Sequence, residues 1–93
     1  MQFFKSDDKT IYVPLELMRN KDLKTSDKLI ITVIGNEESK YGICSLHNAD
    51  IASRCNVSES TVTRSINKLI KKGYLKKVSF DGRNRVIKLT NLV

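Results

Sequence analysis

The side chains that could do chemistry in this sequence are mainly hydroxyls and cations, and two groups of them lie close together between positions 58 and 85. Three hydroxyls stand close together at Ser58, Ser60 and Thr61, and Arg64 and Lys68 follow at helical spacing. Short hydroxyl side chains let a helix backbone approach the edges of nucleic-acid bases, and an arginine can donate two hydrogen bonds to guanine. This spacing therefore favours recognition of a nucleic acid by one face of a helix.

A second group of cations lies within and on either side of the turn-forming residues 81–84: Lys76, Lys77, Arg83 and Arg85. Cations placed there could follow a phosphate backbone or enter a narrow, AT-rich minor groove. The charge is segregated, because residues 54–93 hold ten basic and two acidic residues whereas residues 1–53 hold seven basic and eight acidic ones. Solubility alone would not require this segregation, so the second half indicates a polyanionic partner.

The sequence offers no set of residues typical of an active site. It has a single histidine, His47, no nucleophile with a credible base, no glycine-rich phosphate loop and no paired carboxylates in an apolar setting. We therefore expect no enzymatic activity and no cofactor, and we interpret His47 as a helix cap.

The pattern Cys44-x₂-His47-x₇-Cys55 lacks the fourth ligand and the paired short spacings of a structural zinc site. We expect no metal and interpret both cysteines as buried thiols, which fits a reduced, cytoplasmic compartment. The longest apolar stretch, residues 29–34, is far shorter than the roughly 18 residues of a membrane span, and two adjacent acids near the N-terminus argue against a signal peptide.

Two helices and a hairpin account for the positions of these residues. The sequence predicts a helix that begins at His47 or Asn48 and ends before the break at Asn56-Val57. A second helix begins at Glu59 after a Ser58 cap, and Gly73 ends it. Its buried stripe is predicted to be Val62, Ile66, Leu69 and Ile70. The period then changes to two, which predicts a β-hairpin of residues 74–80 and 85–90.

The upstream half is predicted to support this unit. Residues 10–13 are typical of a short strand, Pro14 ends it, and a short helix runs to about Asn20. A longer helix is expected from a cap near Thr25 to Gly35-Asn36, followed by a polar loop over residues 37–40 and a brief strand over 43–46. The fold class is therefore α+β: one domain over residues 1–93, with about four short helices, a short N-terminal strand and a C-terminal two-stranded wing.

The central run resembles a known pattern, and its residues are Ile51-Ala52-x-x-Cys55-Asn56-Val57-Ser58-x-Ser60-Thr61-Val62-x-Arg64-x-Ile66-x-x-Leu69-x-x-x-Gly73-Tyr74-Leu75. This pattern is similar to that of the winged helix-turn-helix family, which includes bacterial regulators and the initiator domains of Gram-positive plasmids and phages. Upstream, Tyr12-Val13-Pro14-x-x-Leu17 followed by Leu23 and Lys28-Leu29 is similar to the initiator type. Glu59 departs from the pattern, since such regulators often have a basic residue there.

The resemblance covers roughly residues 10–90, with the helix-turn-helix at about 48–72 and the wing at about 74–90. It implies that Ser58, Ser60, Thr61, Arg64 and Lys68 are the helix contacts to double-stranded DNA and that Arg83 and Arg85 are the wing contacts. Lys76 and Lys77 join them as basic residues of the wing. The function predicted from these residues is sequence-specific DNA binding in the replication or transfer machinery of a plasmid or phage.

Several alternatives stay open at the level of sequence. The chain could be a transcriptional regulator that binds DNA in the same way. It could also be a winged-helix adaptor that binds another protein, or a protein that binds nucleic acid without sequence preference. An AT-rich target, a homodimer on DNA and a larger replication or transfer protein are left open as partners. No membrane partner is expected.

Overall fold

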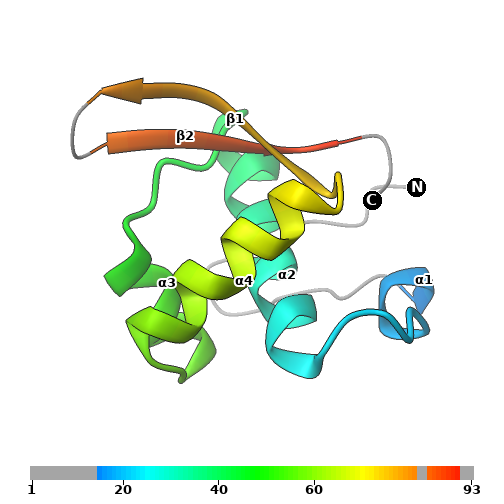
Figure 1. Ribbon diagram of the computed structural model, residues 1–93. Helices are drawn as coiled ribbons and strands as arrows, with labels where there is room; N and C mark the ends of the chain where they lie inside the picture. The colour runs from blue at the N-terminus through cyan, green and yellow to red at the C-terminus, as the bar shows by residue number, and fades with distance from the viewer. Residues whose placement is uncertain (1–14, 82–83, 91–93) are drawn as a thin grey trace.

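The computed structural model describes residues 15–81 and 84–90. The strand expected at residues 10–13, Pro14 and the predicted DNA contact Arg83 lie outside the described residues. In chain order the elements are α1 (Leu15–Met18), α2 (Thr25–Tyr41), α3 (Asn48–Cys55), α4 (Glu59–Lys71), β1 (Leu75–Asp81) and β2 (Asn84–Leu89). Figure 1 shows the hairpin of β1 and β2 crossing over one side of the helical part, with α4 packed against α2. The predicted α+β winged-helix class is confirmed.

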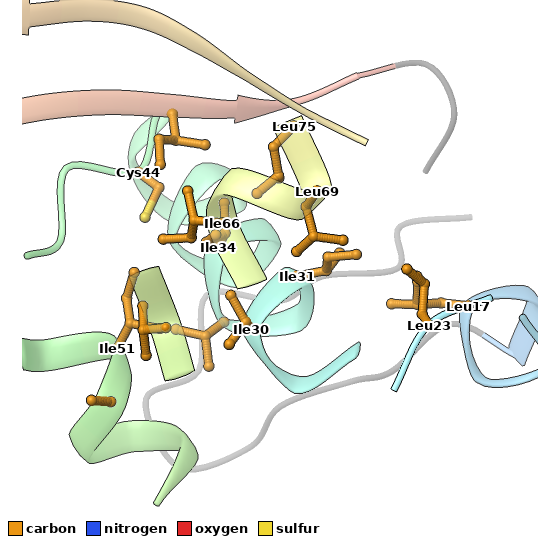
Figure 2. Close-up of a cluster of buried hydrophobic side chains, with 14 residues drawn as sticks. Leu17, Leu23, Ile30, Ile31, Ile34, Cys44, Ile51, Ile66, Leu69 and Leu75 are labelled. Carbon is orange, nitrogen blue, oxygen red and sulfur yellow. The ribbon is translucent and has the colours of Figure 1, made fainter. Parts of the chain in front are cut away.

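The core forms where the fully buried middle of α2 and the apolar stripes of α3 and α4 meet the inner face of the hairpin (Figure 2). On α4 the predicted stripe is confirmed for Val62, Ile66 and Leu69, which are all buried, while Ile70 is only partly buried at its edge. The other residues of this cluster come from four further elements: Ile30, Ile31 and Ile34 from α2, Ile51 from α3, Leu75 from β1 and Ile87 from β2. Burying this face fixes which side of α4 remains exposed.

The predicted end of the long helix at Gly35-Asn36 is wrong. Helix α2 continues to Tyr41 and ends at Gly42, which has the left-handed φ of 81° that favours glycine. The supposed polar loop is its last turns, and Glu37 within it is buried and accepts a hydrogen bond from Nη1 of Arg54 at 3.1 Å. Burial of residues 30–37 together with this contact to α3 outweighs the cost of about 1 kcal/mol that a glycine adds inside a helix.

The predicted first residues of the helices agree with the structure better than the predicted capping side chains do. Helix α2 begins at Thr25, but the cap position is Lys24 rather than Thr25. Helix α3 begins after His47 as expected, although the His47 side chain makes no capping hydrogen bond. Ser58 caps α4 as predicted, because its Oγ accepts a hydrogen bond from the backbone N–H of Thr61.

The hairpin is antiparallel, and its register runs from Leu75 opposite Leu89 to Asp81 opposite Asn84, with an irregularity between Lys77 and Ser79. The brief strand expected at residues 43–46 is a single bridge, in which Cys44 exchanges two backbone hydrogen bonds of 3.0 Å with Ile87. This bridge fastens β2 to the segment between α2 and α3. Within the described residues, no helix is long and apolar enough to cross a membrane.

Candidate nucleic-acid interface

Helices α3 and α4 are joined by a tight turn that depends on one backbone conformation. Asn56 adopts φ 56° and ψ 47°, a left-handed conformation that asparagine tolerates better than most residues. Its N–H donates back toward the carbonyls of Ala52 and Ser53, and Val57 N–H bonds to the Ala52 carbonyl at 3.0 Å. The chain therefore turns within three residues, and α4 starts beside the end of α3.

The start of α4 carries a cluster of hydroxyls. Ser58 Oγ lies 3.1 Å from Ser60 Oγ and 2.9 Å from Thr61 Oγ1, and it accepts from Thr61 N at 3.1 Å. Ser58 and Ser60 are exposed and Thr61 is half-buried. Hydroxyls can donate or accept, so this cluster can adapt to several patterns of donors and acceptors. Arg64 is exposed one turn later, and its Nε donates to the Ser60 carbonyl at 3.4 Å.

Lys68, predicted as a DNA contact, has a partner inside the protein. Its Nζ donates to Oδ2 of Asp27 at 2.6 Å, and Asp27 is 2% exposed. The same carboxylate accepts from Ser65 Oγ at 2.7 Å and from the backbone N–H of Lys24 at 3.0 Å. This network ties the first turn of α2 to the middle of α4 and so holds α4 at a fixed angle.

Asp27 is the structural residue of the site that sequence reasoning missed. Burial alone would raise the pKa of its carboxyl group, but the hydrogen bonds from Lys68, Ser65 and Lys24 outweigh burial and hold that pKa below the ordinary 3.8. A signal was present, because an acidic residue at the third position of a helix can accept from the cap backbone. Its partners Ser65 and Lys68 lie about 40 positions away and could not be paired from sequence.

A hollow of about 270 Å³ opens between the start of α2 and the outer side of α4. It is lined by Lys24, Ser26, Asp27, Thr61, Arg64, Ser65 and Lys68. Three of these residues are cations and one is an acid. The candidate interface is thus continuous with a positively charged recess beside α4.

On the wing, Lys76 and Lys77 are exposed on β1, whereas Arg85 on β2 is half-buried. Nη1 of Arg85 donates to the Leu46 carbonyl at 3.0 Å and Nη2 donates to Oδ1 of Asn48. Burial lowers the pKa of Arg85. Arg85, like Lys68, was predicted as a DNA contact, and its charged group is hydrogen-bonded within the protein.

The residues considered for metal or thiol chemistry are dispersed. Among the described residues, no group of three or more His, Cys, Asp or Glu side chains is arranged to hold a metal ion. Cys44 is buried and Cys55 is half-buried, and burial raises the pKa of both thiols. A raised pKa favours the protonated thiol, which is the less reactive form.

We expect Asp27→Asn to lower stability by about 1–3 kcal/mol at neutral pH, because it replaces charge-assisted hydrogen bonds with neutral ones. In the wild type, the depressed pKa of Asp27 means that its contribution is full above the unfolded value and is lost as the pH falls through the folded value. The variant should therefore lose less stability on acidification. Urea unfolding at neutral pH and near pH 3 measures both effects.

The control for this experiment is Asp22→Asn, since Asp22 is exposed on the segment just before α2. It should change stability by less than about 0.5 kcal/mol. An Asp27→Asn variant as stable and as sensitive to acid as the wild type would contradict the structural role of the Asp27 network.

The geometry was compared with known proteins. A family model described as "Helix-turn-helix domain" matches residues 21–75, which include α2, α3 and α4 and reach the first residue of β1. A search of curated proteins found no match.

Three solved structures have a similar fold. They are the PcaV transcriptional regulator from Streptomyces coelicolor, in complex with its natural ligand (TM-score 0.64, 20% identity), the adhesin competence repressor AdcR from Streptococcus pyogenes (0.61, 26%), and a MarR family transcriptional regulator from Silicibacter pomeroyi (0.59, 22%). The matches cover 83%, 84% and 83% of this chain. They cover 52%, 55% and 49% of the other chains, so this chain spans about half the length of those regulators.

Proposed function

Since the chain belongs to the helix-turn-helix domain family and is a winged-helix DNA-binding domain, we propose that it reads a specific duplex sequence with α4 in the major groove. The wing then lies on the flanking backbone or in the adjacent minor groove. The major groove is about 12 Å wide and admits one helix, and the first turns of a recognition helix reach the base edges.

The observation that carries this proposal is the exposed face at the start of α4. Ser58, Ser60 and Arg64 are exposed on it, and Thr61 is half-buried beside them. The opposite face is held in the core by Val62, so α4 cannot turn this surface inward without unfolding. Short hydroxyls allow close approach to the groove floor, and the Arg64 guanidinium can reach O6 and N7 of guanine.

Charge supports the same orientation. Residues 54–93, which hold α4 and the hairpin, carry ten basic residues against two acidic ones, whereas residues 1–53 carry no basic excess. Lys76 and Lys77 are exposed on β1, where they would meet phosphates flanking the groove. Glu59, exposed at the first position of α4, would accept a hydrogen bond from a cytosine amino group. We propose Arg83 as a further wing contact from its place in the sequence alone.

We propose transcriptional regulation as the biological role, because the three solved structures of similar fold are transcriptional regulators or a repressor. The initiator role in plasmid or phage replication rests on the upstream sequence resemblance alone and stays a prediction. The adaptor role, a homodimer on DNA, an AT-rich target and a larger replication partner likewise remain predictions.

The test is Arg64→Ala on a duplex selected from a random pool and on a scrambled duplex of equal composition. The variant should lose about 1–3 kcal/mol, or roughly 5- to 150-fold, on the selected duplex and much less on the scrambled one. Its preference for the selected sequence should therefore shrink. Fluorescence anisotropy with both duplexes measures the two affinities.

Lys76→Ala is the matched control, since it removes one exposed cation from the wing. It should weaken binding to both duplexes by a similar factor and leave the preference for the selected sequence unchanged. If Arg64→Ala keeps the preference while Lys76→Ala or Arg83→Ala abolishes it, the wing is the reader and the proposed helix-first docking is wrong.

A further inference from the structure

Arg85 lies on the face of β2 that is turned toward the helices. Ile87, two residues further along the strand, shares this face and is 1% exposed, with its backbone bonded to Cys44. The Arg85 side chain therefore points to the segment before α3, where it is half-buried. This orientation differs from that of Lys76, which lies opposite Lys88 on the other face of the hairpin and is exposed.

From Arg85 a continuous chain of hydrogen bonds runs to the recognition helix. Nη1 donates to the Leu46 carbonyl at 3.0 Å and Nη2 to Oδ1 of Asn48, the first residue of α3. Nδ2 of Asn48 donates to Oγ1 of Thr63 at 3.0 Å. Thr63 Oγ1 in turn donates to the Glu59 carbonyl in the first turn of α4 at 3.1 Å. Wing, α3 and α4 are thus joined by side chains as well as by the core.

We infer that Arg85 is a positioning residue that sets the wing at a fixed orientation to α4, through Asn48 and Thr63, so that both surfaces engage one duplex together. This inference rests on the proposed DNA-binding function. A surface already held in its bound geometry loses less freedom on binding, so the network raises affinity without touching DNA.

The experiment is a double-mutant cycle of Arg85→Ala and Asn48→Ala, measured by anisotropy on a mixed-sequence duplex of about 21 base pairs, two helical turns. Each single variant should bind about tenfold more weakly, a middle value for residues in one hydrogen-bond network. The double variant should bind no more weakly than the worse single variant, since either change breaks the same chain. Asn48→Ala matters most here because it removes no charge.

The salt dependence separates positioning from contact. The slope of log affinity against log salt should be the same for Arg85→Ala and the wild type, because no phosphate contact is lost. Lys76→Ala, the matched loss of an exposed cation, should flatten that slope by about 0.9 and add fully to Asn48→Ala. Arg85→Gln keeps an amide donor without the charge, so it should bind more tightly than Arg85→Ala with the wild-type slope.

Each alternative outcome overturns a distinct claim. If the wild type binds the duplex but Arg85→Ala and Arg85→Gln flatten the slope by about 0.9 and add fully to Asn48→Ala, Arg85 is a phosphate contact and the inference is wrong. If circular dichroism shows that Arg85→Ala does not fold, the other two variants test the inference. A flattened salt slope for Arg85→Gln, or wild-type affinity for Asn48→Ala, would then contradict it. A wild type that binds no duplex overturns the proposed function and, with it, this inference.

Discussion

Val62→Asp is expected to unfold the domain. Val62 is fully buried at the start of the α4 stripe, and it belongs to the core cluster that α4 forms with α2 and α3. A carboxylate there has to be buried without a partner or bind a proton, and either costs several kcal/mol. Small domains have about 5–15 kcal/mol of stability in total, so the loss is comparable to the whole. Circular dichroism should show no cooperative thermal transition.

The matched control is Asn67→Asp, which places the same side chain at an exposed position of the same helix. It should melt within a few degrees of the wild type, because exposed substitutions rarely change stability by more than about 0.5 kcal/mol. A cooperative melt of Val62→Asp at the wild-type temperature would mean that the buried face of α4 has been assigned incorrectly. The exposed face proposed to read DNA would then be wrong too.

Helix α4 could be predicted from the sequence because all of its signals are local. The Ser58 cap, the stripe through Val62 and Leu69, and Gly73 with its φ of 89° lie within 16 positions of one another. The cap and Gly73 act on the backbone of the helix itself, the stripe determines which face is buried, and all three agree with the tertiary packing. The placement of Ser60 and Arg64 on the exposed face followed directly from this periodicity.

The end of α2 could not be predicted for the opposite reason. Gly35 and Asn36 are the residues that usually follow a helix, and both are buried inside this one. What keeps the helix going is its packing and the pairing of Glu37 with Arg54, which is 17 positions away. Long-range contacts of this kind leave no mark in the local pattern.

Lys68 and Arg85, whose charged groups bond to residues far away in the sequence, illustrate the same limit within the candidate interface. Lys68 has the spacing of a DNA-facing residue, and Arg85 lies in a basic hairpin, so local reasoning gave both the same role as Arg64. Their partners Asp27 and Asn48 lie 41 and 37 positions away. A net count of basic residues shows that a polyanion is favoured, but it does not separate the cations that contact it from those that hold the fold.

Duplex binding is expected to fall steeply with salt. If about five to seven phosphates are contacted per protomer, the slope of log affinity against log salt is about −4.5 to −6. A fourfold rise, from about 50 to 200 mM, then lowers affinity by roughly 500- to 4,000-fold. The effect arises because each cation that meets a phosphate releases condensed counterions, a process that high salt opposes. The exposed Lys76 and Lys77 are expected to contribute to it, together with Arg64.

The measurement that tests the central claim most directly is therefore an anisotropy titration of the wild type against its selected duplex at four or more salt concentrations. Binding through the basic half of the chain predicts a slope between about −4.5 and −6 on that duplex. It also predicts weaker binding, still dependent on salt, to a scrambled duplex. A slope near zero, or no binding at the lowest salt concentration, would contradict the proposal that this domain is a reader of double-stranded DNA.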